Sequence, residues 1–146
     1  MTEQPAPAFF APASSAIVIR QGQLLLVKRS KPPAADLYAF PGGRGEPGET
    51  PEETALRELK EETGLSAHAP SLFASYDLYP DPGGPSHHHF RLSVFLVTLD
   101  DPAAAAVAQS DAAALGWYSP VEIRDLPVPP SVRDCVEKLV VCGKAA

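Results

Sequence analysis

The sequence predicts an α/β domain in which a central mixed β-sheet is flanked by helices. Strand-like segments outnumber helical ones and do not alternate regularly with them, which favours a mixed sheet over a doubly wound parallel fold. The 146 residues, 45% hydrophobic and 21% charged, suit one folded domain with one core. We expect residues 1–12, which are rich in proline and alanine, to form a loose arm and residues 13–146 to form the domain.

The first predicted elements form a β-hairpin. Residues 14–20 indicate a strand, and Gln21-Gly22 marks a tight turn. Residues 23–29 follow as a continuous apolar run that ends in two basic residues, which is typical of a strand buried on both faces. The two prolines in residues 31–36 predict a loop.

The next element is a helix over Pro51–Thr63, which has clear start and stop signals. Thr50 can cap the first turn, and Pro51 suits the first helical position. Glu53 completes a capping box with Thr50. Gly64 ends the helix at its C-terminal side.

The second half of the chain predicts three strands and one helix. Residues 68–78 and 89–99 are strand-like and are joined by the turn-rich segment 80–85. Residues 115–119 predict a short strand, and residues 131–141 predict an amphipathic helix.

The charge of the chain excludes several classes of partner. It has 12 Lys and Arg against 18 Asp and Glu, a net charge of −6, which repels a nucleic acid backbone. No apolar stretch approaches the roughly 20 residues that span a bilayer. Residues 1–15 contain no Lys or Arg, unlike the start of a secretion signal. We therefore expect a cytoplasmic protein that binds neither nucleic acid nor membrane.

Three glutamates gather on one side of the predicted helix. Glu58, Glu61 and Glu62 stand at i, i+3 and i+4, while apolar residues share the opposite side. Like charges at this spacing repel one another, and a hard cation such as Mg²⁺, which prefers oxygen ligands, relieves the repulsion. The glycine-rich segment 42–45 lets backbone groups approach a metal or a phosphate closely. A solvated acidic face and a metal site both remain open on these residues alone.

The spacing of the charged residues and glycines resembles the Nudix box. Nine specified positions agree over twenty-three residues: Gly43, Glu49, Arg57, Glu58, Leu59, Glu61, Glu62, Gly64 and Leu65. The similarity to Nudix hydrolases extends over about residues 14–125. It implies a Nudix fold, an α/β/α sandwich around a central mixed sheet. It also implies Mg²⁺-dependent hydrolysis, with Mn²⁺ as a substitute, of a nucleoside diphosphate linked to another group.

The resemblance also implies roles for individual residues. The carboxylates of Glu58, Glu61 and Glu62 and the carbonyl of Gly43 would hold the metal. Glu49 would pair with Arg57, fix the loop relative to the helix and complete the catalytic set.

Residues outside the box supply candidate contacts to a small nucleotide substrate. Arg44 and Arg29 are expected to clamp phosphate, because a guanidinium binds phosphate oxygens bidentately. Phe40 is a candidate for stacking on the base, and His89 for lining the cleft. Two assignments of the general base are open: Glu61 or Glu62 acting through metal-bound water, which we favour, and Asp111, which lies before Trp117, where some Nudix enzymes bring in a late acid.

Three interpretations of function remain open. Segments 37–46 and 86–90 resemble the bacterial ADP-ribose pyrophosphatase-like branch, which predicts ADP-ribose or a similar nucleotide sugar as substrate. That branch usually has Trp where this chain has Tyr38, and a β-branched residue where it has Gly45. The alternatives are a MutT-like nucleoside triphosphate pyrophosphohydrolase and a non-catalytic sensor of nucleotide derivatives. Homodimers are frequent among ADP-ribose-acting relatives, which leaves a homodimer open, although no feature of the sequence marks an interface.

Overall fold

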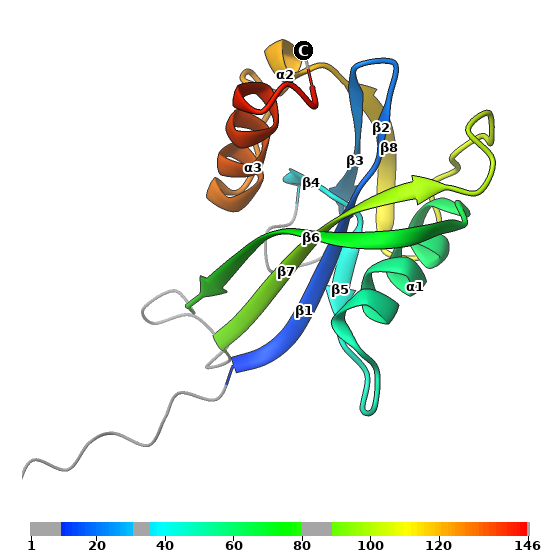
Figure 1. Cartoon of the computed structure of the whole chain (residues 1–146), viewed down its shortest axis with the longest axis vertical. Coiled ribbons are helices and arrows are strands. Elements are labelled where there is room, and N and C mark those ends of the chain that lie inside the picture. Colours follow the sequence, from blue (N-terminus) through cyan, green and yellow to red (C-terminus); the bar gives the residue numbers. More distant parts are fainter. Residues whose placement is uncertain (1–9, 31–35, 80–88, 146) are drawn as a thin grey trace, which may run out of the picture.

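The computed structural model describes residues 10–30, 36–79 and 89–145 (Figure 1). The predicted turn at residues 80–85 and most of the predicted loop at 31–36 lie outside this part. The strands are β1 (Phe10–Ile17), β2 (Ile19–Arg20), β3 (Gln23–Arg29), β4 (Tyr38–Ala39), β5 (Gly42–Arg44), β6 (Ala67–Leu78), β7 (His89–Leu99) and β8 (Ala112–Tyr118). The helices are α1 (Pro51–Thr63), α2 (Pro120–Ile123) and α3 (Pro130–Val141).

The strands form two sheets that lie between the helices. The first is a mixed sheet with the order β5-β1-β7-β6, in which β1 and β7 run parallel and the other pairs are antiparallel. In the second, β3 pairs antiparallel with β2, β4 and β8. Helix α1 covers one side, and α2 and α3 lie on the other (Figure 1). The α/β/α sandwich is confirmed, with its central layer divided into two sheets.

The core is split in two because successive strand residues point to opposite faces. In β1, Ile17 packs in the cluster that includes Val136 and Leu139 of α3. Its neighbour Ala16 packs in the cluster that includes Ala55 and Leu59 of α1. We call these two sides of the mixed sheet the α3 face and the α1 face. Burial on both faces explains why the first strands read as apolar runs without clear alternation.

Helix α1 has the bounds and caps that its sequence predicts. The Thr50 side chain accepts a hydrogen bond from the Glu53 backbone N–H at 3.1 Å, and the Glu53 carboxylate accepts one from the Thr50 N–H at 2.9 Å. Gly64 follows with φ 77°, a left-handed conformation that costs glycine little. Local signals therefore determine where this helix begins and ends.

Some boundaries differ from the sequence prediction. The first strand begins at Phe10, because residues 10–12 pair in parallel with His89–Arg91 of β7. The end of the predicted arm thus belongs to the sheet, while residues 1–9 lie outside the described part. Strands β4 and β5 and helix α2 were not predicted, since two to four residues carry no periodic signal. No helix in the described part is long and apolar enough to cross a membrane.

Candidate metal and phosphate site

Two glutamates of α1 lie against the backbone of strand β5. A Cβ atom placed on Gly43 would stand 2.6–2.8 Å from the carboxylate atoms of Glu58. The Gly42 N–H donates a hydrogen bond to Glu62 Oε2 at 2.9 Å. The missing side chain of Gly43 leaves the space that the Glu58 carboxylate occupies, and the backbone of Gly42 holds Glu62.

Arg57 connects this helix to the loop before it. Its guanidinium binds Glu49 through two hydrogen bonds, Nε to Oε2 at 2.7 Å and NH2 to Oε1 at 3.0 Å. NH1 donates to Glu58 at 2.9 Å and to Glu61 at 3.1 Å. NH2 also donates to the Arg44 carbonyl at 2.9 Å. The predicted pair of Glu49 and Arg57 is present, and it orders the acidic face of the helix.

The Glu49–Arg57 pair makes stability depend on pH. Hydrogen bonds from Arg57 and Thr54 lower the pKa of Glu49 from 4.5 to about 2. The ionised carboxylate therefore stabilises the folded state fully above pH 4.5, and this contribution is lost as the pH falls toward 2. We expect Glu49→Gln to reduce the free energy of unfolding at pH 7 and to have a smaller effect at pH 3, where part of the contribution is already lost, measured by urea denaturation.

Glu46→Gln is the matched control for this measurement. The Glu46 carboxylate is exposed and stands 3.7 Å from Arg57, so its loss should change stability little. A deficit of Glu49→Gln that is equal at both pH values would contradict the assignment.

Burial raises the pKa values of the two glutamates beside β5. Glu62 is 6% exposed, and its burial raises its pKa to about 7 against the opposing effect of the Gly42 hydrogen bond. The nearby charge of Glu58 raises it further. Burial also raises the pKa of Glu58, while Arg57 acts in the opposite direction. Two carboxylates held this close in a low-dielectric site favour a positive charge between them.

The oxygen atoms of these glutamates and of the β5 backbone suit a hard divalent cation as ligands, although they are not arranged around one in this structure. Carboxylate and carbonyl oxygens are the ligands that Mg²⁺ prefers. Within residues 10–30, 36–79 and 89–145, no three acidic, His or Cys side chains converge as a preformed metal site. The reason is visible at α1: Arg57 binds Glu58 and Glu61, whereas Glu62 turns toward Gly42.

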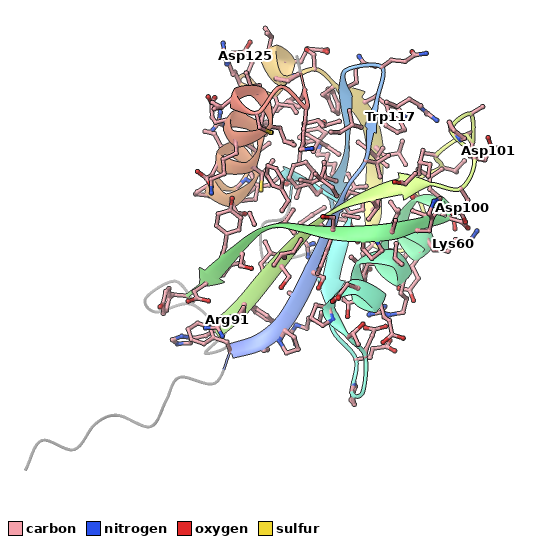
Figure 2. All side chains as sticks on the ribbon, viewed as in Figure 1. Lys60, Arg91, Asp100, Asp101, Trp117 and Asp125 are labelled. Atoms are coloured by element: carbon pink, nitrogen blue, oxygen red, sulfur yellow. The ribbon has the colours of Figure 1, made fainter. Side chains whose placement is uncertain are left out.

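The segment after β7, which carries Asp111, docks on the C-terminal end of α1, and Arg29 ends strand β3. The Gln109 N–H donates to the Glu62 carbonyl at 2.9 Å, and the Val107 N–H donates to the Thr63 carbonyl at 2.9 Å. This segment starts beside Lys60, with Asp100 and Asp101 near the C-terminal end of α1 (Figure 2). The negative charge of Asp111 raises the pKa of Glu62, and the positive charge of Arg29 lowers it. Asp111 and Arg29 therefore act electrostatically on the glutamate site.

The predicted substrate contacts Arg44 and His89 are on opposite faces of the mixed sheet. The Arg44 guanidinium lies 4.8 Å from the ring centre of Phe90, on the α3 face. His89 points to the α1 face, where its ring packs against those of Phe10 and Tyr79 at 5.3 and 5.0 Å. Neighbouring strand residues alternate, so Phe90 rather than His89 accompanies Arg44.

Phe40 is part of the core and is not a surface for a base. It is 5% exposed and packs in the cluster beneath α3. The half-buried Tyr38 packs edge-on against Tyr118, with ring centres 5.7 Å apart. Among the aromatic residues Phe40, Tyr38 and Phe90, it is Phe90 that stands beside Arg44, the candidate for binding phosphate.

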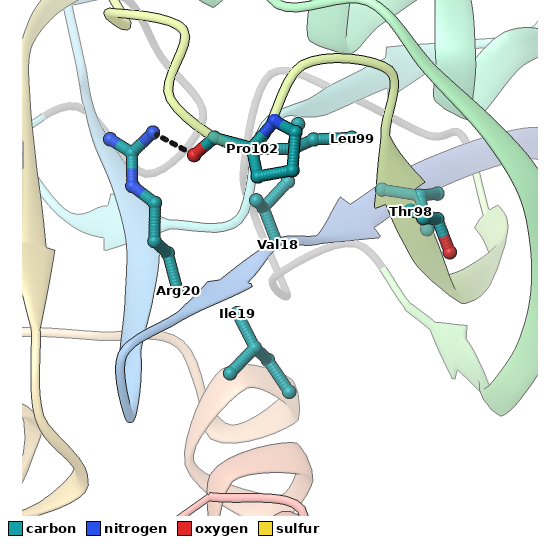
Figure 3. A pocket seen from close by; sticks show the side chains of 7 residues that line it. Val18, Ile19, Arg20, Thr98, Leu99 and Pro102 are labelled. Carbon is teal, nitrogen blue, oxygen red and sulfur yellow. Dashed lines mark hydrogen bonds between the residues drawn. The ribbon is translucent and has the colours of Figure 1, made fainter.

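A hollow of about 280 Å³ lies at the junction of β2 and the end of β7 (Figure 3). Arg20 lines it, but its guanidinium donates to the carbonyls of Pro102 and Ala104 at 3.1 and 2.8 Å. The same group stands 4.0 Å from the ring centre of Trp117. The hollow contains none of the predicted site residues, and Arg20 serves to hold the segment after β7.

The comparison with known proteins identifies the family. The NUDIX domain family matches residues 10–139, which include the glycines of β5, helix α1 and most of α3. This match covers most of the chain, and the protein belongs to the NUDIX family.

The proteins that this chain is similar to are named for different enzymatic activities. The ADP-ribose pyrophosphatase of Methanocaldococcus jannaschii is 38% identical over 89 residues, 61% of this chain and 51% of that protein. The 8-oxo-dGTP diphosphatase of Proteus vulgaris is 43% identical over 63 residues, 42% of this chain and 50% of that protein. The CTP pyrophosphohydrolase of Escherichia coli is 30% identical over 118 residues, 80% of this chain and 82% of that protein. The chain thus spans about half the length of the first two relatives.

Solved structures share the fold over nearly the whole chain. The MutT NUDIX hydrolase of Burkholderia pseudomallei has a TM-score of 0.77 and 24% identity, covering 88% of this chain and 97% of that one. The E. coli ORF135 protein has a TM-score of 0.75 and 26% identity, covering 98% and 100%. The likeness extends over both sides of the sandwich.

Proposed function

We propose that the protein hydrolyses the diphosphate linkage of a nucleoside diphosphate derivative, with Mg²⁺ as the cation and Mn²⁺ as a substitute. The observation that carries the proposal is the approach of Glu58 and Glu62 to the glycines of β5. Family membership and the activities in the relatives' names support it.

The metal would be held by the carboxylates of Glu58, Glu61 and Glu62 and by the Gly43 carbonyl. A divalent cation neutralises charge on a diphosphate and activates water for attack at phosphorus. Gly43 leaves space for Glu58, and the Gly42 N–H fixes the direction of the Glu62 carboxylate.

The remaining residues position the substrate and the helix. Arg57 and Glu49 hold the loop against α1, so that the carbonyl of Gly43 stays beside the helix. Arg44, which stands over Phe90, would bind a phosphate oxygen. Arg29 would bind phosphate through its guanidinium. Glu61 or Glu62, acting through metal-bound water, is the favoured general base, and Asp111, whose charge acts on Glu62, is the second candidate.

We favour ADP-ribose or a similar nucleotide sugar as substrate, on the resemblance of segments 37–46 and 86–90 and the 38% identity to an ADP-ribose pyrophosphatase. A nucleoside triphosphate is the second candidate. The length of the match favours this second candidate. The chain matches 82% of the CTP pyrophosphohydrolase but only 51% of the ADP-ribose pyrophosphatase. A cytoplasmic location and a homodimer remain predictions.

The test is release of phosphate from a substrate panel after coupled phosphatase treatment. The panel contains ADP-ribose, other nucleotide sugars, NADH, dinucleoside polyphosphates and common and oxidised triphosphates. We expect turnover of one class with Mg²⁺, complete loss with EDTA, and recovery on adding Mg²⁺ or Mn²⁺. Preference for a triphosphate would replace the nucleotide-sugar assignment. Cation binding without turnover of any compound would favour a sensor of nucleotide derivatives.

A further inference from the structure

Ser14 of β1 carries a buried hydroxyl group without a hydrogen-bond partner. The residue is 1% exposed. Within the described residues, its Oγ is one of two buried side-chain polar atoms that make no hydrogen bond, the other being Nδ1 of His89. A buried hydroxyl group without a partner lowers stability, so such a group calls for an explanation beyond packing.

The strand register places Ser14 on the same face of the sheet as the Glu58 carboxylate, next to the glycine that this carboxylate contacts. Ser14 is the direct antiparallel partner of Gly43, so the two positions share the α1 face and their Cβ positions are about 4.5–5.5 Å apart. The carboxylate of Glu58 lies within 2.8 Å of the place where a Gly43 Cβ would stand. Ser14 is therefore the cross-strand neighbour of that carboxylate.

A charged hydrogen-bond donor holds the Glu58 carboxylate in this structure. Arg57 NH1 donates to its Oε1 at 2.9 Å. A cation that takes the Glu58 carboxylate competes with the guanidinium for it, because both are positively charged. A neutral donor on β1 would keep the carboxylate in place during that exchange.

We propose that Ser14 is a positioning residue of the metal centre: its hydroxyl supports the Glu58 carboxylate when a divalent cation is bound. The inference rests on the proposed function, since it needs a cation at Glu58. Groups that orient metal ligands typically contribute 10–100-fold to metal affinity. Ser14 touches neither the cation nor the substrate in this assignment and acts through Glu58.

The test measures Mn²⁺ binding by the electron paramagnetic resonance signal of the free ion, without substrate. We expect Ser14→Ala to weaken Mn²⁺ binding about tenfold or more. We also expect its urea midpoint in EDTA to equal or exceed that of the wild type, because the variant removes an unpaired buried hydroxyl. A merely structural serine would lower the midpoint and leave Mn²⁺ affinity unchanged.

Ser93→Ala is the matched control. Ser93 is the parallel partner of Ser14 in β7, on the same face but one strand further from β5, and its loss should leave Mn²⁺ affinity at the wild-type value. Equal Mn²⁺ affinity of Ser14→Ala and wild type would overturn the role of Ser14, as would equal weakening by both serine variants. A wild-type protein that binds no Mn²⁺ would overturn the proposed metal site itself, so the two failures are distinguishable.

Discussion

Glu58→Gln is expected to lower kcat/KM with saturating Mg²⁺ by at least about 100-fold while the protein remains folded. The amide has nearly the size of the carboxylate, so the contact with Gly43 survives. The negative charge that would bind the cation is lost, and the loss of a direct ligand should exceed the 10–100-fold effect typical of groups that only orient one. Arg57 keeps its two hydrogen bonds to Glu49, which preserves the link between loop and helix.

The control for this variant is Glu52→Gln in the same helix. Glu52 is exposed in the first turn of α1, and losing its charge should leave kcat/KM within about twofold. Activity would be measured on the compound that gives turnover in the panel, and folding by circular dichroism and urea denaturation. If Glu58→Gln keeps wild-type kcat/KM, Glu58 does not hold the metal and the proposed site has to be reassigned.

The sequence predicted best the elements that local chemistry determines. The bounds of α1 follow from Thr50, Glu53 and Gly64, which cap its two ends by contacts within a few residues. The β2–β3 hairpin likewise turns at Gln21-Gly22. The start of β1 at Phe10 could not be predicted in this way, because it depends on pairing with His89, far along the chain.

The same distinction applies to the candidate site. The pair of Glu49 and Arg57 follows from the motif spacing and is present at 2.7 Å. The separation of His89 in β7 from Arg44 in β5 depends on which face of the mixed sheet each residue takes, and a shift of one residue in the strand register reverses that choice. The effect of Asp111 on Glu62 depends on a segment that docks on the end of α1 through backbone hydrogen bonds, which leave no pattern of side chains in the sequence.

The burial of individual residues could not be predicted from the sequence either. An aromatic such as Phe40 suits a core and a binding surface equally well, and only the packing beneath α3 assigns it to the core. Glu62 was predicted on the charged side of α1, yet its side chain is buried. Its hydrogen bond to Gly42 makes that burial tolerable.

Alanine substitutions at the two neighbouring glycines of β5 should have different effects, one on stability and the other on activity. A Cβ at Gly42 would overlap the Ser14 carbonyl oxygen and stand 2.8 Å from Ser15 Cα. These are backbone atoms of the partner strand and cannot move without disturbing the β1–β5 pairing. Gly42→Ala should therefore reduce the free energy of unfolding by about 1–3 kcal/mol, the usual effect of overpacking, and serves as the structural comparison.

Gly43→Ala should instead reduce activity and Mn²⁺ affinity while its unfolding free energy stays near the wild-type value. The new Cβ would meet the Glu58 carboxylate at 2.6–2.8 Å, and this end of a flexible side chain can move away. Glu58 then leaves the position it needs, and a displacement of about 1 Å at a reacting centre can cost about 100-fold in rate. Urea denaturation, Mn²⁺ titration and kcat/KM on the same samples separate the two effects. A Gly43→Ala protein that loses stability as Gly42→Ala does, yet keeps its activity per folded molecule, would show that this glycine serves the strand and not the glutamate.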